Sequence, residues 1–197
     1  MNTAKTSDKD SPKFQQIIET ATDLFMRFGV KRVTVEEICQ TAKISKMTFY
    51  KYFKNKIDLA EYIIFSIFEN ATNEFEPIWS RSSTLDEKIN QFYILKMKYA
   101  KKFSKEFLFD FMNLSPKIHN RVMDYSKMNQ ILFLKNIKQA QEKGDIRKDV
   151  SINLISYMLN HLLELAEDEK FLAMYSNTED LTLELMNFYF YGIMGKK

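Results

Sequence analysis

The residues best suited to chemistry lie between Lys43 and Lys56, where five lysines occur and no acidic residue does. Threonine and tyrosine side chains stand among these lysines. Such a set suits a polyanion, because lysines pair with phosphates and hydroxyl groups donate to phosphate oxygens. A run of like charge is also what an ordinary solvated helix face presents. From charge alone, nucleic-acid binding and a solvated face both stay open.

The positive charge is concentrated near the N-terminus. Residues 1–60 hold 11 basic and 7 acidic residues, a net charge of +4, whereas the remaining 137 residues hold 18 and 19, a net charge of −1. A basic patch on a near-neutral body indicates one face built for a polyanion. A non-specific nucleoid protein or a membrane-surface protein would need a larger basic surplus.

Patterns for catalysis or metal binding do not occur in the sequence. The two histidines, His119 and His161, and the single Cys39 have no spacing suited to zinc. No glycine-rich phosphate loop and no nucleophile elbow is present. We therefore expect neither an enzyme nor a bound cofactor or metal. A helical enzyme or carrier with an aromatic cavity is the alternative, but it lacks an acid–base or nucleophile set.

The composition favours an all-α protein. Of 197 residues, 45% are hydrophobic and 14% aromatic, while only four glycines and three prolines interrupt the chain. No apolar N-terminal segment indicates secretion, and no stretch reaches the roughly 20 apolar residues of a membrane span. The lone cysteine fits a reducing compartment. We expect a cytoplasmic protein without a membrane partner.

Hydrophobic periodicity predicts about nine helices. The first begins near Phe14, with Pro12 in its first turn and Gly29 beyond its end. The fourth begins after Asn55 and is expected to break at Glu76–Pro77. The later helices are expected over residues 85–103, 104–112, 116–143, 152–166 and 181–194.

Two short helices joined by a tight turn lie within the basic segment. Thr34 is suited to cap the first of them and Ser45 the second. Phe49 and Phe53 are four residues apart, so we expect both to face inward. Together with the preceding helix, this arrangement is a helix-turn-helix, whose second helix enters the major groove. A bundle corner with a lysine-rich exterior is the alternative. The side chains expected outside are Lys46, Met47, Thr48, Tyr50, Lys51 and Tyr52.

The stretch from Thr34 to Leu59, with Tyr50-Lys51-Tyr52-Phe53 followed by Asn55-Lys56, resembles the DNA-binding domain of the tetracycline-repressor (TetR) family. The resemblance implies that Thr34, Tyr50 and Lys56 hold the phosphate backbone. It also implies that four side chains lie closest to the bases, although many members have glycine where this chain has Met47. These four are Lys46, Met47, Thr48 and Lys51.

The resemblance also implies a division of the chain and a partner. Residues 1–56 would form the DNA-binding domain, with 1–11 flexible, and residues 57–197 a helical regulatory and dimerisation domain. A homodimer would form through the last two helices and read a palindromic duplex operator. The apolar stripes compatible with that interface are Ile152, Ile155, Met158, Leu159, Leu162 and Leu163, and Leu181, Leu185, Met186, Phe188, Tyr189 and Ile193.

Finally, the resemblance implies a repressor that leaves its operator when a small apolar or amphipathic molecule binds the C-terminal domain. Phenylalanine and methionine are adaptable wall residues for such a ligand. They are equally ordinary core residues, and both readings stay open. The candidates are Phe65, Phe92, Met97, Phe107, Phe111, Met112 and Met158, with Phe68 and Met123 beside them.

Overall fold

A computed structural model describes residues 11–165 and 168–193, without the side chains of Leu163 and Ile193. The expected flexibility of residues 1–10 and the expected last helical residue, Met194, therefore lie outside the described part. Within that part the elements are ten α-helices, which confirms the all-α class and corrects the expected number of about nine. The helices are α1 (Pro12–Phe28), α2 (Val35–Thr41), α3 (Lys46–Tyr52), α4 (Lys56–Ser80), α5 (Leu85–Ala100), α6 (Lys105–Asn113), α7 (Pro116–Lys143), α8 (Ile152–Glu164), α9 (Glu169–Ala173) and α10 (Thr178–Ile193).

Local sequence signals set where the helices begin and end. The Ser11 side chain accepts a hydrogen bond from the backbone N–H of Phe14, and Gly29 ends α1 at a φ of 77°. Thr84 and Glu87 form a reciprocal capping box that opens α5. Gly144 closes α7 in the left-handed conformation. These ends agree with the sequence expectations to within a few residues.

Two expectations about the helices were wrong. Helix α4 does not break at Glu76–Pro77 but continues to Ser80, with the proline in its last turns. The proline removes one backbone donor, but Ile78 and Trp79 beyond it are buried in the core and hold the final turn in place. The short helix α9 was not expected, because its capping residue Asp168 stands in an acidic cluster that resembles a helix end.

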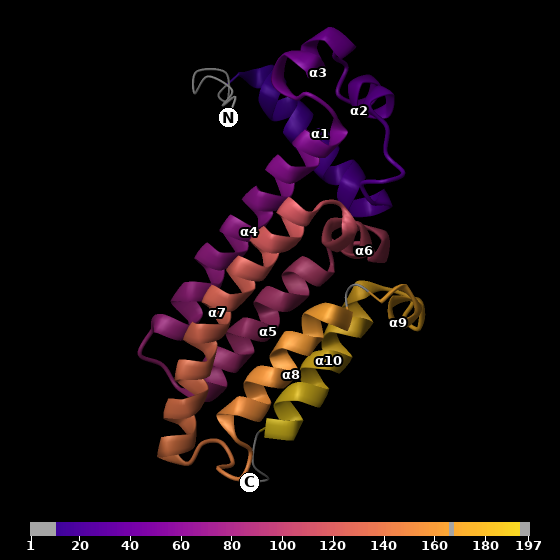
Figure 1. The fold of residues 1–197 in the computed structure, drawn as a ribbon. Coiled ribbons are helices and arrows are strands. Elements are labelled where there is room, and N and C mark those ends of the chain that lie inside the picture. Colours follow the sequence, from indigo (N-terminus) through magenta and orange to yellow (C-terminus); the bar gives the residue numbers. More distant parts are fainter. Residues whose placement is uncertain (1–10, 166–167, 194–197) are drawn as a thin grey trace.

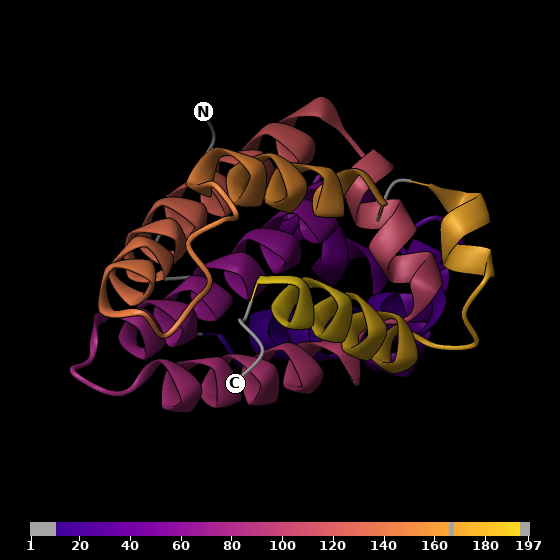
Figure 2. The ribbon, with the colours of Figure 1, turned by 90° about the horizontal axis from the view of Figure 1, so that it is seen from below.

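The helices form a small head and a longer body (Figure 1). Helices α1 to α3 make the head, and α4 runs from it along the body beside α7. In the body, α10 packs on α5 and α8 packs on α7. Seen along the body, these two pairs lie on different sides of α4 (Figure 2).

Two hydrophobic cores stabilise the molecule. The first joins the head to the body, since Phe14, Phe49 and Phe53 share it with Phe111 and Ile118 of α6 and α7. The second lies farther along the body, between the end of α4 and helices α5, α7, α8 and α10. The first core thus continues across residue 56, where the sequence placed a domain boundary, so the head is anchored firmly to α4 and α6.

Candidate functional site

The turn between α2 and α3 is tight and well fixed. Lys43 adopts a φ of 48°, which lies in the left-handed region. The backbone N–H of Ile44 then donates to the carbonyl of Cys39 at 3.0 Å. Ala42 and Cys39 are buried at this corner, where the thiol packs as a small apolar group. Burial raises the pKa of the Cys39 thiol. The two short helices are therefore held at a defined angle.

Helix α3 is anchored by its two phenylalanines, as the spacing predicted. Phe49 and Phe53 are buried, and the Phe53 ring stacks on Phe14 of α1 with centroids 5.5 Å apart. The Ser45 side chain caps the helix by accepting from the N–H of Thr48 at 3.1 Å. The inward face of α3 is thus fully used by packing.

The opposite face of α3 is open to solvent. Met47 is 81% exposed and Tyr50 is 53% exposed. Lys46 and Lys51 are also exposed, while Thr48 is half-buried and shares a 2.9 Å hydrogen bond with the Ser45 hydroxyl. The outward direction predicted for these side chains is confirmed. Their contacts with DNA stay predictions.

Tyr52 departs from the expectation that it would be available outside. Its hydroxyl shares a 2.7 Å hydrogen bond with the Ser11 hydroxyl, and its ring packs edge-on against Phe14 at 5.5 Å. The cause is the helical period, because position 52 turns back toward α1 next to the buried Phe49 and Phe53. Tyr52 therefore serves the joint between α1 and α3.

Lys46 is paired across the helix-turn-helix with Glu36 of α2. The hydrogen bond between these side chains raises the pKa of Lys46 and lowers that of Glu36. Both groups are exposed, so solvent screens the pair. Glu36 was not singled out from the sequence, because its contact with Lys46 depends on how α2 and α3 cross. The lysine expected nearest to bases thus has an acidic partner when DNA is absent.

Lys56 and Thr34 meet at the loop between α1 and α2. The Lys56 ammonium donates to the backbone carbonyls of Lys31 at 2.9 Å and Val33 at 2.7 Å. Partial burial lowers the pKa of Lys56. Thr34 is exposed and caps α2 by accepting from the N–H of Glu37. Lys56 therefore orders the segment that carries Thr34, and an ammonium with three donors keeps capacity for a further acceptor.

The chain was compared with known proteins. The family model described as "Bacterial regulatory proteins, tetR family" matches residues 17–63, from α1 into α4. The chain is 31% identical over 96 residues to the fatty acid metabolism regulator protein of Bacillus subtilis, covering 49% of this chain and 44% of that protein. It is 32% identical over 113 residues to the HTH-type dhaKLM operon transcriptional activator DhaS of Lactococcus lactis, covering 53% and 59%. These alignments span about half the length of the curated relatives.

The structural comparison extends over nearly the whole chain. The ketosteroid transcriptional regulator KstR2 of Mycobacterium tuberculosis superposes with a TM-score of 0.67, covering 95% of this chain and 97% of that one at 14% identity. The fold of head and body together is therefore shared. Residues 17–63 are therefore similar to TetR-family proteins, and the fold of the whole chain is similar to that of KstR2. The curated relatives that match this chain are named as regulators.

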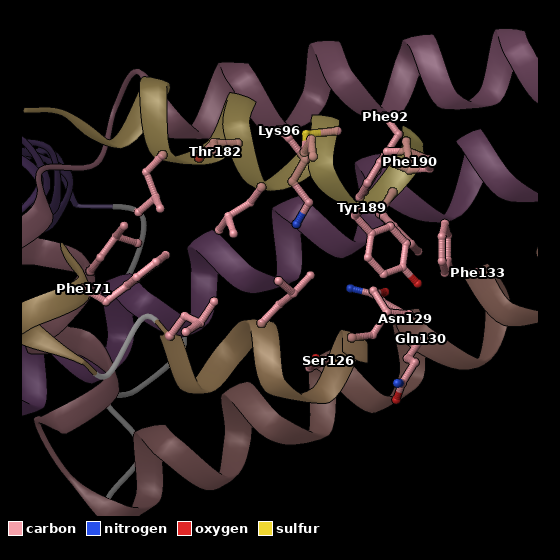
Figure 3. A pocket seen from close by; sticks show the side chains of 18 residues that line it. Phe92, Lys96, Ser126, Asn129, Gln130, Phe133, Phe171, Thr182, Tyr189 and Phe190 are labelled. Carbon is pink, nitrogen blue, oxygen red and sulfur yellow. The ribbon is translucent and has the colours of Figure 1, made fainter. Parts of the chain in front are cut away.

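The body of the chain contains an open pocket of about 350 Å³, whose walls come mainly from α5, α7, α8 and α10. Figure 3 shows the side chains that surround it. Most are apolar, and the polar ones come mainly from α7. The lining residues are Phe75, Phe92, Lys96, Leu108, Ser126, Asn129, Gln130, Phe133, Leu159, Leu162, Leu165, Phe171, Leu181, Thr182, Leu185, Met186, Tyr189 and Phe190.

Most ligand candidates from the sequence lie elsewhere. Only Phe92 lines the pocket. Phe107, Phe111 and Met112 fill the first core from the inner face of α6, and Phe65 packs against that core. Met158 is 40% exposed on α8, and Met97 is half-buried on α5. Phe68, which stood beside these candidates, packs against the first core, and Met123 is half-buried on α7. Ligand contact by these residues stays a prediction.

The sequence reasoning missed the polar lining residues Lys96 and Asn129. A signal was present, because Lys96 follows Phe92 by four residues and Asn129 precedes Phe133 by four, so each shares a helix face with an aromatic residue. Polar side chains on an otherwise apolar face are candidates for ligand contact.

The outer faces of α8 and α10 carry exposed apolar side chains. Phe188 is 73% exposed and Tyr191 is 77% exposed. Part of the interface set expected from the sequence was wrong, because four of its residues are buried within the subunit. These four are Ile155, Leu181, Met186 and Tyr189. The side chains of Leu163 and Ile193, which also belonged to the set, lie outside the described part. The α8–α10 patch, as we name it, consists of Leu154, Tyr157, Met158, Leu183, Phe188 and Tyr191.

Within the described residues, no three histidine, cysteine or acidic side chains gather as a metal site. No helix in the same part of the chain is long and apolar enough to cross a membrane.

Proposed function

We propose that this chain is a sequence-specific DNA-binding transcriptional regulator of bacteria. The observation that carries the proposal is the division of α3 into a buried face, with Phe49 and Phe53, and an open face, with Lys46, Tyr50 and Lys51. A helix exposed in this way fits the major groove, where lysine donates to guanine and a phenolic hydroxyl donates to phosphate. Such a protein would act in the bacterial cytoplasm, where its operator lies.

The residue roles follow from position. Residues 1–56 would form the DNA-binding domain, and residues 57–197 the regulatory and dimerisation domain. Thr34, Tyr50 and Lys56 would contact the phosphate backbone, because they lie at helix starts and on the rim of α3. The residues assigned to base contact are Lys46, Met47, Thr48 and Lys51. Met47 would add apolar contact at the centre of this face.

The α8–α10 patch supports a homodimer. Exposed aromatic and aliphatic side chains on the outer faces of α8 and α10 fit an interaction surface. A two-fold dimer would place two α3 helices about 34–36 Å apart, one turn of duplex DNA, and would read a palindromic operator.

We propose that the regulator is a repressor released by an apolar or amphipathic small molecule in the body pocket. The pocket's size and apolar lining suit such a ligand. Matched relatives are named for fatty acid metabolism and for ketosteroid regulation, which agrees with an apolar effector, and one is named an activator. Release requires that the ligand prefer the conformation that fits DNA poorly.

DNA binding is tested by selecting duplexes from a random library and titrating the best one with salt. About six phosphate contacts per dimer predict a slope near −5 for the logarithm of affinity against the logarithm of salt concentration. Lys56→Met should weaken all duplexes alike, whereas Thr48→Ala and Lys51→Met should change the preferred sequence. No selected palindrome, or a flat salt response, would contradict the proposal.

A further inference from the structure

One feature of the body pocket stands apart from its apolar lining. Lys96 of α5 extends into it, and Figure 3 shows the ammonium nitrogen pointing toward the middle of the pocket. No aspartate or glutamate occurs among the described lining residues. The ammonium lies 5.2 Å from the centroid of the Phe92 ring. No ion pair joins Lys96 to any acidic residue in the described part of the chain. The pocket therefore carries a positive charge that the subunit does not neutralise.

The apolar surroundings oppose that charge. Desolvation by neighbouring groups lowers the pKa of Lys96. Lys96 is nevertheless an exposed residue, so its ammonium stays hydrated while the pocket is empty. A ligand that fills the pocket would displace this water and leave the ammonium in need of an anion. A neutral or cationic ligand would leave the Lys96 ammonium without an anionic partner.

The other polar lining groups leave room for an anion beside Lys96. Tyr189 donates its hydroxyl to the carbonyl of Ile155 at 3.3 Å, and the Gln130 amide donates to Ser156. Asn129 forms no hydrogen bond with another described residue, and Figure 3 shows it entering the pocket from the α7 side, opposite Lys96. An ammonium and an amide from two walls suit the two oxygens of a carboxylate.

We infer that the effector is an amphipathic carboxylate, whose anionic group is held by Lys96 and Asn129 while its apolar body lies among the leucines of α8 and α10 and Phe190. This inference rests on the proposed effector function of the same pocket. It adds the sign of the ligand's charge and the residue that selects it. Charge-assisted hydrogen bonds are the strong ones in such a partly dry site.

The inference is tested by calorimetric titration of the full chain with three ligands of equal chain length: decanoate, decanol and decyltrimethylammonium. The unsubstituted protein should bind decanoate about tenfold or more tightly than decanol, and the cation most weakly. Lys96→Met should abolish the preference for decanoate without weakening decanol. Lys101→Met, in the exposed turn just after α5, removes the same charge outside the pocket and should retain the preference.

Lys96→Gln is the second variant if Lys96→Met lowers the melting temperature, and it should lose the preference in the same way. Equal affinities for decanoate and decanol, or no decanoate binding, would overturn the inference. So would a preference that survives both Lys96 variants. DNA binding without ligand is measured separately with the selected duplex. If the chain bound no duplex, the regulator proposal would be wrong. The decanoate result would still report on the charge of the ligand that the pocket prefers.

Discussion

At the scale of single residues, one of the lysines on the open face of α3 already has an acidic partner. Lys46 is paired with Glu36, although this pair is exposed and weakened by solvent. To reach a base or a phosphate, Lys46 must leave that carboxylate. Glu36 therefore competes with DNA twice, by holding Lys46 and by placing a negative charge near the phosphates.

Glu36→Gln should tighten binding to the selected duplex about two- to fivefold, because it removes this competition. Fluorescence anisotropy at fixed low salt measures the change. Glu37→Gln is the matched control, since it removes the same charge from the neighbouring position of α2 without releasing Lys46. Equal effects of both variants would mean that only net charge matters and that the Lys46 pair has no role.

At the scale of elements, the helix-turn-helix depends on one unusual backbone position. Lys43 holds a left-handed φ in the turn between α2 and α3. Residues other than glycine adopt this region at a cost, which is smallest for asparagine and aspartate and largest for β-branched residues. The turn thus tolerates a lysine whose side chain points to solvent, but its conformation limits what else it accepts.

Lys43→Val should unfold more easily than Lys43→Asn, by roughly 1–2 kcal/mol in the free energy of unfolding. Both variants lose the same charge, so their difference reports the backbone strain. Urea denaturation followed by circular dichroism measures it. Equal midpoints would show that the turn relaxes to another conformation.

The elements were largely predictable from sequence because capping residues are local signals. Thr34 and Ser45 each cap the helix that they were expected to cap. The contacts that the sequence analysis did not predict join residues of different helices. The Lys46–Glu36 pair joins two helices, and Lys96 enters a pocket lined by residues of six other helices, so neither follows from any single periodic stretch.

At the scale of the whole molecule, the proposed homodimer would form through the α8–α10 patch. Its aromatic side chains lie on helices that are otherwise packed on α7 and α5. Exposed aromatic and aliphatic side chains gathered on a surface often mark a contact with a partner. The patch also borders the pocket, because α8 and α10 supply lining residues on their inner faces.

Light scattering should give a mass near twice 23.5 kDa for the unsubstituted chain. Phe188→Lys should shift the mass toward the monomer at micromolar concentration, because a buried, unpaired charge at an interface is strongly unfavourable. Met174→Lys, at a residue 76% exposed outside the patch, is the control and should remain dimeric. A Phe188→Lys protein with unchanged mass would place the interface elsewhere.

Helix α7 connects the two ends of the molecule without an intervening loop. Its 28 residues extend roughly 42 Å. Ile118 near its start is packed in the same core as Phe49, and Asn129 in its middle lines the pocket. Since packed interiors resist compression, we expect α7 to move as one rigid element. A ligand in the proposed effector pocket would therefore contact the middle of a helix whose first turns pack in the same core as Phe49 of α3, and a displacement of α7 would reach α3 through that core.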